Sequence, residues 1–143
     1  MDPMEAIKIT FFQECDELLG DLEAGLLTLE TGGGDSETVN AVFRAVHSVK
    51  GGAGAFGLEP LVRFAHVFET TMDMVRSGAL AAEPHVIKVL LRAADHLADH
   101  VGAAKAGGAP VGGDDLIVGE LEALTAGVGS APAPAAAPEP SVP

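Results

Sequence analysis

The sequence contains no tryptophan or tyrosine, a single cysteine, and only 8 lysines and arginines against 21 acidic residues, which gives a formal net charge of −13. One cysteine, Cys15, cannot form a disulfide framework or a cysteine metal cluster. The acidic excess argues against binding to nucleic acid or to anionic membranes, because both repel a negative surface. No apolar run reaches the length of a membrane-spanning helix, and the N-terminus lacks the apolar region of a signal peptide. We therefore expect a soluble, cytoplasmic protein.

Apolar residues recur at helical spacing through most of the chain, and breaks rich in glycine or proline divide it into segments. The apolar stripe of the first segment begins at Ile7 and that of the last at Leu116. Four long amphipathic segments joined by short loops predict an all-α fold, an antiparallel up-down four-helix bundle with a short fifth C-terminal helix. The expected helices span about 4–30, 36–56, 59–77, 84–106 and 114–126.

The length of 143 residues corresponds to one domain, which we place at residues 1–129. Residues 130–143 contain five prolines and five alanines. Such a composition does not form a packed element, so we expect an extended linker to a further region.

The segment 45–57, which reads AVHSVKGGAGAFG, has an unusual surface. On a helix, the apolar residues around it gather on one face and His47 lies on the opposite face. Gly51 and Gly54 fall within roughly 40° of His47 on that face. A glycine inside a helix costs about 1 kcal/mol relative to alanine, so we interpret them as clearing the surface for a macromolecule. The alternative is a helix that ends at these glycines, although Gly57 is the better stop signal.

Two cations and one aromatic residue lie around the histidine. Arg44 and Lys50 are three positions to either side of His47, so both flank it on the helix surface. Phe43 falls roughly 40° from His47, as a rim residue or a docking contact. The local charge is therefore positive in an otherwise acidic chain.

The pattern His-x-x-Lys-Gly followed by a second glycine-rich turn resembles the phosphorylation-site helix of histidine phosphotransfer (HPt) domains. Within that family it is most similar to the amino-terminal phosphotransfer domain of CheA-type chemotaxis kinases. His66 and Glu69, in the segment RFAHVFET, stand where the family places a supporting histidine and glutamate on the next helix. The resemblance covers His47, Lys50, His66 and Glu69 residue by residue. It implies that His47 accepts a phosphoryl group from a CheA-type kinase catalytic domain and passes it to the aspartate of a CheY-like response regulator receiver domain.

This chemistry requires a neutral imidazole with one ring nitrogen facing outward, and a carboxylate bonded to the other nitrogen fixes that tautomer. Glu69 is our candidate for the carboxylate, Lys50 for neutralising the phosphoryl oxygens, and His66 for completing the hydrogen-bond network. The chain shows no Gly-rich nucleotide loop, Walker lysine or aspartate cluster for Mg²⁺. We expect it to bind no cofactor itself, with ATP on the kinase domain and Mg²⁺ on the receiver domain.

Two other functions fit the same residues. One is a helical docking module without chemistry, for which the glycine-cleared face would be the footprint of a partner. The other is a metal site within the bundle formed by His47, His66 and Glu69. The positive charge of Lys50 argues against the metal site.

A second pair of histidines, His96 and His100, has the i, i+4 spacing of a metal-binding pair. No carboxylate at the spacing of a metal motif completes a site. We therefore predict two histidines on the flank of their helix near solvent, and no metal.

Overall fold

The computed structural model describes residues 2–108 and 111–129, which contain five α-helices and no β-strand. This confirms the all-α prediction, and the helix bounds agree closely with those expected, except that the last helix is longer. The predicted linker at 130–143 lies outside the described residues. The helices are α1 (Pro3–Glu30), α2 (Ser36–Ala55), α3 (Glu59–Arg76), α4 (Pro84–Lys105) and α5 (Asp114–Gly129).

The ends of α2 follow from local chemistry. The Asp35 side chain accepts a hydrogen bond from the Thr38 backbone N–H at 3.0 Å, and the Thr38 hydroxyl accepts one from the Asp35 backbone N–H. This reciprocal pair is a capping box, which satisfies backbone donors at the helix start. At the other end Gly57 has a φ of +67°, a conformation that favours glycine. Because α2 continues to Ala55, the alternative of a helix that ends at the glycines is wrong.

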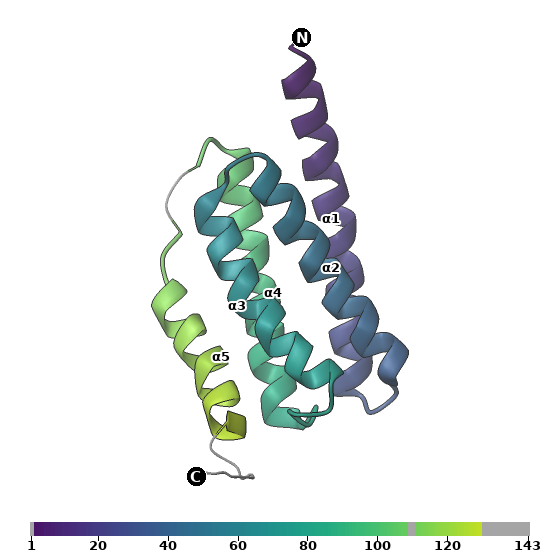
Figure 1. The fold of residues 1–143 in the computed structure, drawn as a ribbon. Coiled ribbons are helices and arrows are strands. Elements are labelled where there is room, and N and C mark those ends of the chain that lie inside the picture. Colours follow the sequence, from purple (N-terminus) through teal and green to yellow (C-terminus); the bar gives the residue numbers. More distant parts are fainter. Residues whose placement is uncertain (1, 109–110, 130–143) are drawn as a thin grey trace.

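The helices pack so that α2 and α3 provide one exposed side of the molecule. In Figure 1, α1, α2, α3 and α4 lie side by side, and α5 lies along α3 and α4. The N-terminal part of α1 projects beyond the other helices, and Ile7 on it is 58% exposed, contrary to its place in the predicted apolar stripe. No helix in the described part of the chain is both long and apolar enough to cross a membrane.

The core contains the aliphatic and phenylalanine side chains of all five helices. Cys15 is fully buried within it, and burial raises the pKa of its thiol to about 11. The predicted apolar stripe of α5 is only partly correct, since Ile117 and Leu121 are buried and Leu116 is 68% exposed.

Glycines bring α1 and α2 into close contact at two levels. A Cβ atom at Gly25 would lie 2.7 Å from Cγ2 of Val42, and one at Gly52 would overlap the ring of Phe11. Both positions therefore require glycine for packing. Gly52 differs in this respect from its neighbours Gly51 and Gly54, although all three lie within one short stretch of α2.

Candidate functional site

His47 lies on the exposed side of α2, and its side chain is 62% exposed. The opposite face of the helix is buried against the core, as the apolar period predicts. The capping box at Asp35 and the buried face together fix where the imidazole points. The buried residues of α2 are Val39, Val42, Ala45, Val46, Val49 and Ala53.

A carboxylate from the neighbouring helix holds this histidine. Oε2 of Glu69, on α3, contacts Nδ1 of His47, and Oε1 accepts a hydrogen bond from Nζ of Lys50 at 2.6 Å. The Glu69 side chain is only 12% exposed. The structure therefore brings together three of the four residues that the sequence indicates, with Glu69 joining the other two.

The charge of Glu69 determines the tautomer of His47. Burial raises the pKa of the Glu69 carboxyl, but hydrogen bonds from Lys50 and His47 outweigh burial and hold that pKa below its usual value. An ionised carboxylate only accepts hydrogen bonds. Nδ1 of His47 is therefore the donor, and in the neutral tautomer this leaves the ring's lone pair on Nε2.

His66 lies elsewhere. Its residue is exposed, and within the described chain its ring forms no hydrogen bond or ion pair with His47, Lys50 or Glu69. It instead lines a hollow of about 240 Å³ between α3 and α5, together with Glu122 and other residues. His66 therefore does not take part in the hydrogen-bond network that the sequence predicts it to complete. The structure therefore does not bring His66 together with His47 and Glu69, the three ligands considered for a metal site on this face.

The surface beside His47 is open. A Cβ atom at Gly51 or Gly54 would meet nothing within 4 Å. Arg44 is exposed on the same helix. Gly54 also borders a shallow hollow of about 380 Å³ that Val62 and other residues of α3 line. The geometry thus agrees with a surface on which another backbone could approach.

An aromatic residue and an arginine complete this face. The ring of Phe43 stacks nearly parallel to the His47 ring, with centroids 6.1 Å apart and an interplanar angle of 12°. The Arg76 guanidinium lies 4.2 Å from the Phe43 centroid, within the range of a cation–π contact. Arg76 also donates from Nε to Asp73 at 3.1 Å. Sequence patterns do not indicate Arg76, because its contact with Phe43 depends on how α3 crosses α2.

The second histidine pair is buried, and the prediction that it lies near solvent is wrong. His96 is 7% exposed and His100 is 4% exposed. Both Nε2 atoms contact Oδ1 of Asp114, the first residue of α5, and the His100 distance is 2.7 Å. Burial raises the pKa of Asp114, but hydrogen bonds from the two imidazoles outweigh it and lower that pKa. The carboxylate that the helix spacing lacked therefore comes from α5.

Comparison with known proteins gives consistent matches. The family model described as the Hpt domain matches residues 6–106. The chemotaxis protein CheA of Rhizobium meliloti (strain 1021) is 59% identical over 128 residues, which cover 87% of this chain and 16% of that protein. CheA of Cereibacter sphaeroides is 52% identical over 116 residues, which cover 78% of this chain and 17% of that protein. The chain thus spans only a small part of the length of these relatives.

Solved structures agree with the sequence matches. One is the phosphorylated P1 domain of CheA3 in complex with CheY6 from R. sphaeroides, with a TM-score of 0.77 and 27% identity, covering 84% of this chain and 95% of that one. Another is the solution structure of the histidine phosphotransfer domain of CheA, with a TM-score of 0.74 and 26% identity over 84% of this chain and 92% of that one. The likeness therefore extends over nearly the whole of both solved chains.

Proposed function

The chain belongs to the Hpt domain family, and from this premise we propose that residues 1–129 are a phosphotransfer domain of bacterial two-component chemotaxis signalling. His47 accepts a phosphoryl group from a CheA-type kinase catalytic domain and passes it to the aspartate of a CheY-like receiver domain. The observation that carries this function is the contact between Glu69 and Nδ1 of the exposed His47, which leaves Nε2 as the nucleophile. The short loops and pairwise contacts of α1 to α4 also support an antiparallel up-down bundle, and we propose that the domain acts in the cytoplasm.

In the first reaction, the lone pair of Nε2 attacks the γ-phosphorus of ATP held by the kinase domain. The bond from that phosphorus to the bridging oxygen breaks, and ADP leaves with the electron pair. Nδ1 keeps its proton, so the ring becomes more positive as the N–P bond forms. Glu69 opposes that charge and stabilises the transition state, as a carboxylate does for the histidine of a catalytic triad.

In the second reaction, an oxygen of the receiver aspartate attacks the phosphorus. The P–N bond breaks, and its electron pair returns to Nε2, which regenerates the neutral imidazole. Mg²⁺, if held by the receiver domain, would supply positive charge against the phosphoryl oxygens. This chain needs no cofactor of its own for either reaction.

Lys50 has two tasks in this proposal. Its ammonium donates to Glu69 at 2.6 Å, which keeps that carboxylate ionised and oriented toward His47. Because Lys50 lies one turn along α2 from His47, its charge also offsets the negative charge of the phosphoryl group. His66 has neither contact; it lies on α3 at the hollow that α5 also lines, and we assign it no direct part in either reaction.

The partner surface is formed by residues of α2 around His47. The receiver must bring its aspartate against the phosphorus, so two backbones must come close together at Gly51 and Gly54. Arg44 provides positive charge toward the acidic pocket of a receiver. Phe43 provides an apolar edge to the same footprint.

The test is phosphorylation of the chain by a CheA-type kinase domain with radiolabelled ATP. We expect label that is labile in acid and stable in base, located on His47 by mass spectrometry. His47→Gln should remove it, while His85→Gln, at an exposed histidine on α4, serves as the matched control and should keep it. Absence of label, or label that persists in His47→Gln, would contradict the function.

A further inference from the structure

A second cluster of titratable groups lies between α4 and α5, apart from the proposed phosphotransfer residues. One ring nitrogen of His96, one of His100 and one carboxylate oxygen of Asp114 lie within 4.8 Å of one another. Both nitrogens converge on the same carboxylate oxygen, so the three atoms surround one point. We propose that these residues form a binding site for a first-row transition metal ion, with Zn²⁺ as the ion that fits best.

The distances are close to those of a zinc site. With metal–ligand bonds of about 2.0–2.2 Å in a tetrahedron, neighbouring ligand atoms lie roughly 3.3 Å apart. Nε2 of His100 and Oδ1 of Asp114 are 2.7 Å apart, so the carboxylate has to withdraw by less than about 1 Å to admit the ion. Asp114 has this freedom, because it begins α5 directly after Gly112 and Gly113 and its side chain is 38% exposed.

The two imidazoles are held ready by packing. The Phe64 ring lies 4.8 Å from the His96 ring and 5.4 Å from the His100 ring, centroid to centroid. The two imidazoles lie 5.0 Å apart and are nearly perpendicular. Their side chains are 8% and 3% exposed. Rings buried in this way lose little further freedom when an ion binds, which favours binding.

The donor set selects the class of ion. Two imidazole nitrogens and one carboxylate oxygen suit Zn²⁺, Co²⁺, Ni²⁺ and Cu²⁺, whereas Mg²⁺ and Ca²⁺ prefer oxygen ligands alone. Three protein ligands leave a fourth position for water on the side where Asp114 is exposed. His100 also lines a hollow of about 560 Å³, together with Gly57 and Gly108.

Without an ion, the same residues form a hydrogen-bonded contact in which two imidazoles donate to one carboxylate. That contact already joins the start of α5 to α4. This contact alone could explain why the three residues lie together, because buried polar groups need hydrogen-bond partners. Direct measurement of metal binding separates the two explanations.

The experiment is a calorimetric titration of ZnCl₂ into the 143-residue chain after treatment with EDTA, with the Co²⁺ absorption spectrum as a second measurement. We expect one equivalent of Zn²⁺ and a visible Co²⁺ spectrum of tetrahedral type. Asp114→Asn and the double variant His96→Gln/His100→Gln should each weaken binding on the order of 10²-fold, since even changes beyond the ligands cost about 10- to 100-fold. MgCl₂ should not compete.

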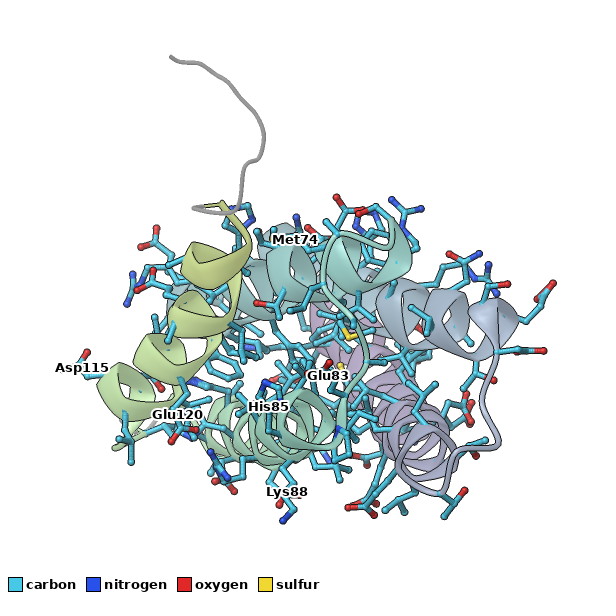
Figure 2. The ribbon with its side chains drawn as sticks, turned by 90° about the horizontal axis from the view of Figure 1, so that it is seen from below. Met74, Glu83, His85, Lys88, Asp115 and Glu120 are labelled. Carbon is cyan, nitrogen blue, oxygen red and sulfur yellow. The ribbon has the colours of Figure 1, made fainter. Side chains whose placement is uncertain are left out.

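Two matched controls give the test its specificity. Asp115→Asn changes the adjacent carboxylate, which points outward from α5 in Figure 2, and should leave Zn²⁺ affinity unchanged. His47→Gln should also bind Zn²⁺ like the wild type. Asp114→Asn is the decisive variant because its side chain is partly exposed, and circular dichroism verifies that it folds.

Three results would overturn the proposal. They are absence of saturable Zn²⁺ binding, equal binding by Asp114→Asn and Asp115→Asn, and loss of binding in His47→Gln. None of these depends on phosphorylation, so the outcome is independent of the proposed function.

Discussion

The molecule contains two places where imidazole meets a carboxylate from the next helix, and they differ in exposure. At the α2–α3 site, the His47 side chain is 62% exposed, and Glu69 holds only its Nδ1. At the α4–α5 site, the side chains of His96 and His100 are 8% and 3% exposed, and each directs Nε2 at Asp114. The α2–α3 site leaves one histidine ring largely exposed to solvent, whereas the α4–α5 site buries both of its imidazole rings.

The neighbours of each carboxylate explain the rest of the difference. Glu69 uses its second oxygen for the ammonium of Lys50, so a cation already occupies the position where a metal ion would bind. Asp114 has no such lysine among its described contacts, and the ring of Phe64 packs against both of its histidines instead. The same two residue types therefore support nucleophilic chemistry in one place and ligand binding in the other.

The largest expected effect concerns which imidazole reacts. In His47→Gln we expect no phosphorylation, because the glutamine amide is not a nucleophile, and we expect a wild-type circular dichroism spectrum. His100→Gln should retain full labelling per folded molecule. Label found on His96 or His100 by mass spectrometry would show that burial of a histidine does not prevent its phosphorylation.

The next effect concerns the carboxylate of the exposed site. Glu69→Gln keeps a hydrogen-bond acceptor but removes the charge that stabilises a positive ring. We expect phosphorylation to slow on the order of 10²-fold, with little change in kinase binding. The rate is measured by single-turnover labelling at saturating kinase domain. Glu59→Gln, at an exposed glutamate on the same helix, is the control, and equal rates for the two variants would contradict the role of Glu69.

A third prediction concerns the surface beside the exposed site. Gly54→Leu fills space that is open in the free chain, so it should slow transfer to the receiver by on the order of 10-fold or more. Gly51→Ala should do so more weakly. Neither should lower the melting temperature, because each removes a glycine from a helix interior. Both phosphotransfer rate and thermal unfolding are measured.

The control for this prediction is Gly102→Leu, on a different helix, α4, where a side chain would likewise meet nothing within 4 Å. It should have no effect on transfer. If Gly54→Leu transferred as fast as Gly102→Leu, the open face around His47 would not be the docking surface.

A smaller effect concerns the enclosed site without metal. With EDTA present, Asp114→Asn removes the charged acceptor of two buried imidazoles, so we expect the free energy of unfolding to fall by about 1 kcal/mol. Asp115→Asn should change it by less than about 0.5 kcal/mol. Urea unfolding followed by circular dichroism measures both. An equal, small effect would mean that the enclosed contact does not stabilise the fold.

The smallest effect is on pH dependence. Folding lowers the pKa of Glu69 below its usual 4.5, so its contribution to stability is complete above that value and is lost as pH falls through the folded pKa. The difference in unfolding free energy between the wild type and Glu69→Gln should therefore shrink between pH 5 and pH 2.5. A difference that stayed constant in urea unfolding across this range would contradict the shift.

How much of this was predictable depends on whether residues lie on one helix or on several. The relation of His47 to Gly51 and Gly54 could be predicted because a helix has a fixed angle per residue. The place of Glu69 opposite His47 came from a family resemblance, and the structure shows the contact. The helix bounds also followed from local signals, such as the cap at Asp35 and the stop at Gly57.

The errors arise where one helix covers another. Periodicity shows which side of α4 is apolar, but it does not show that α5 packs over His96 and His100 and brings Asp114 to them. Periodicity likewise does not show which residues of α5 face the other helices, and Leu116, expected in the apolar stripe, is exposed. Ile7 is exposed because the N-terminal end of α1 extends beyond the ends of the other helices. The sequence pattern of α1 does not show how far its neighbours extend.

Gly52 and Gly54, both on α2 shortly after Lys50, have different consequences for a cell that carries a variant. A side chain at Gly52 would collide with Phe11, so such a chain would fold poorly and simply be lost. A side chain at Gly54 is expected to leave a stable domain that still accepts phosphoryl groups but passes them to the receiver more slowly. That chain would take phosphoryl groups from the kinase and withhold them from the receiver, so it would act dominantly over a normal copy. The Gly52 variant would be recessive.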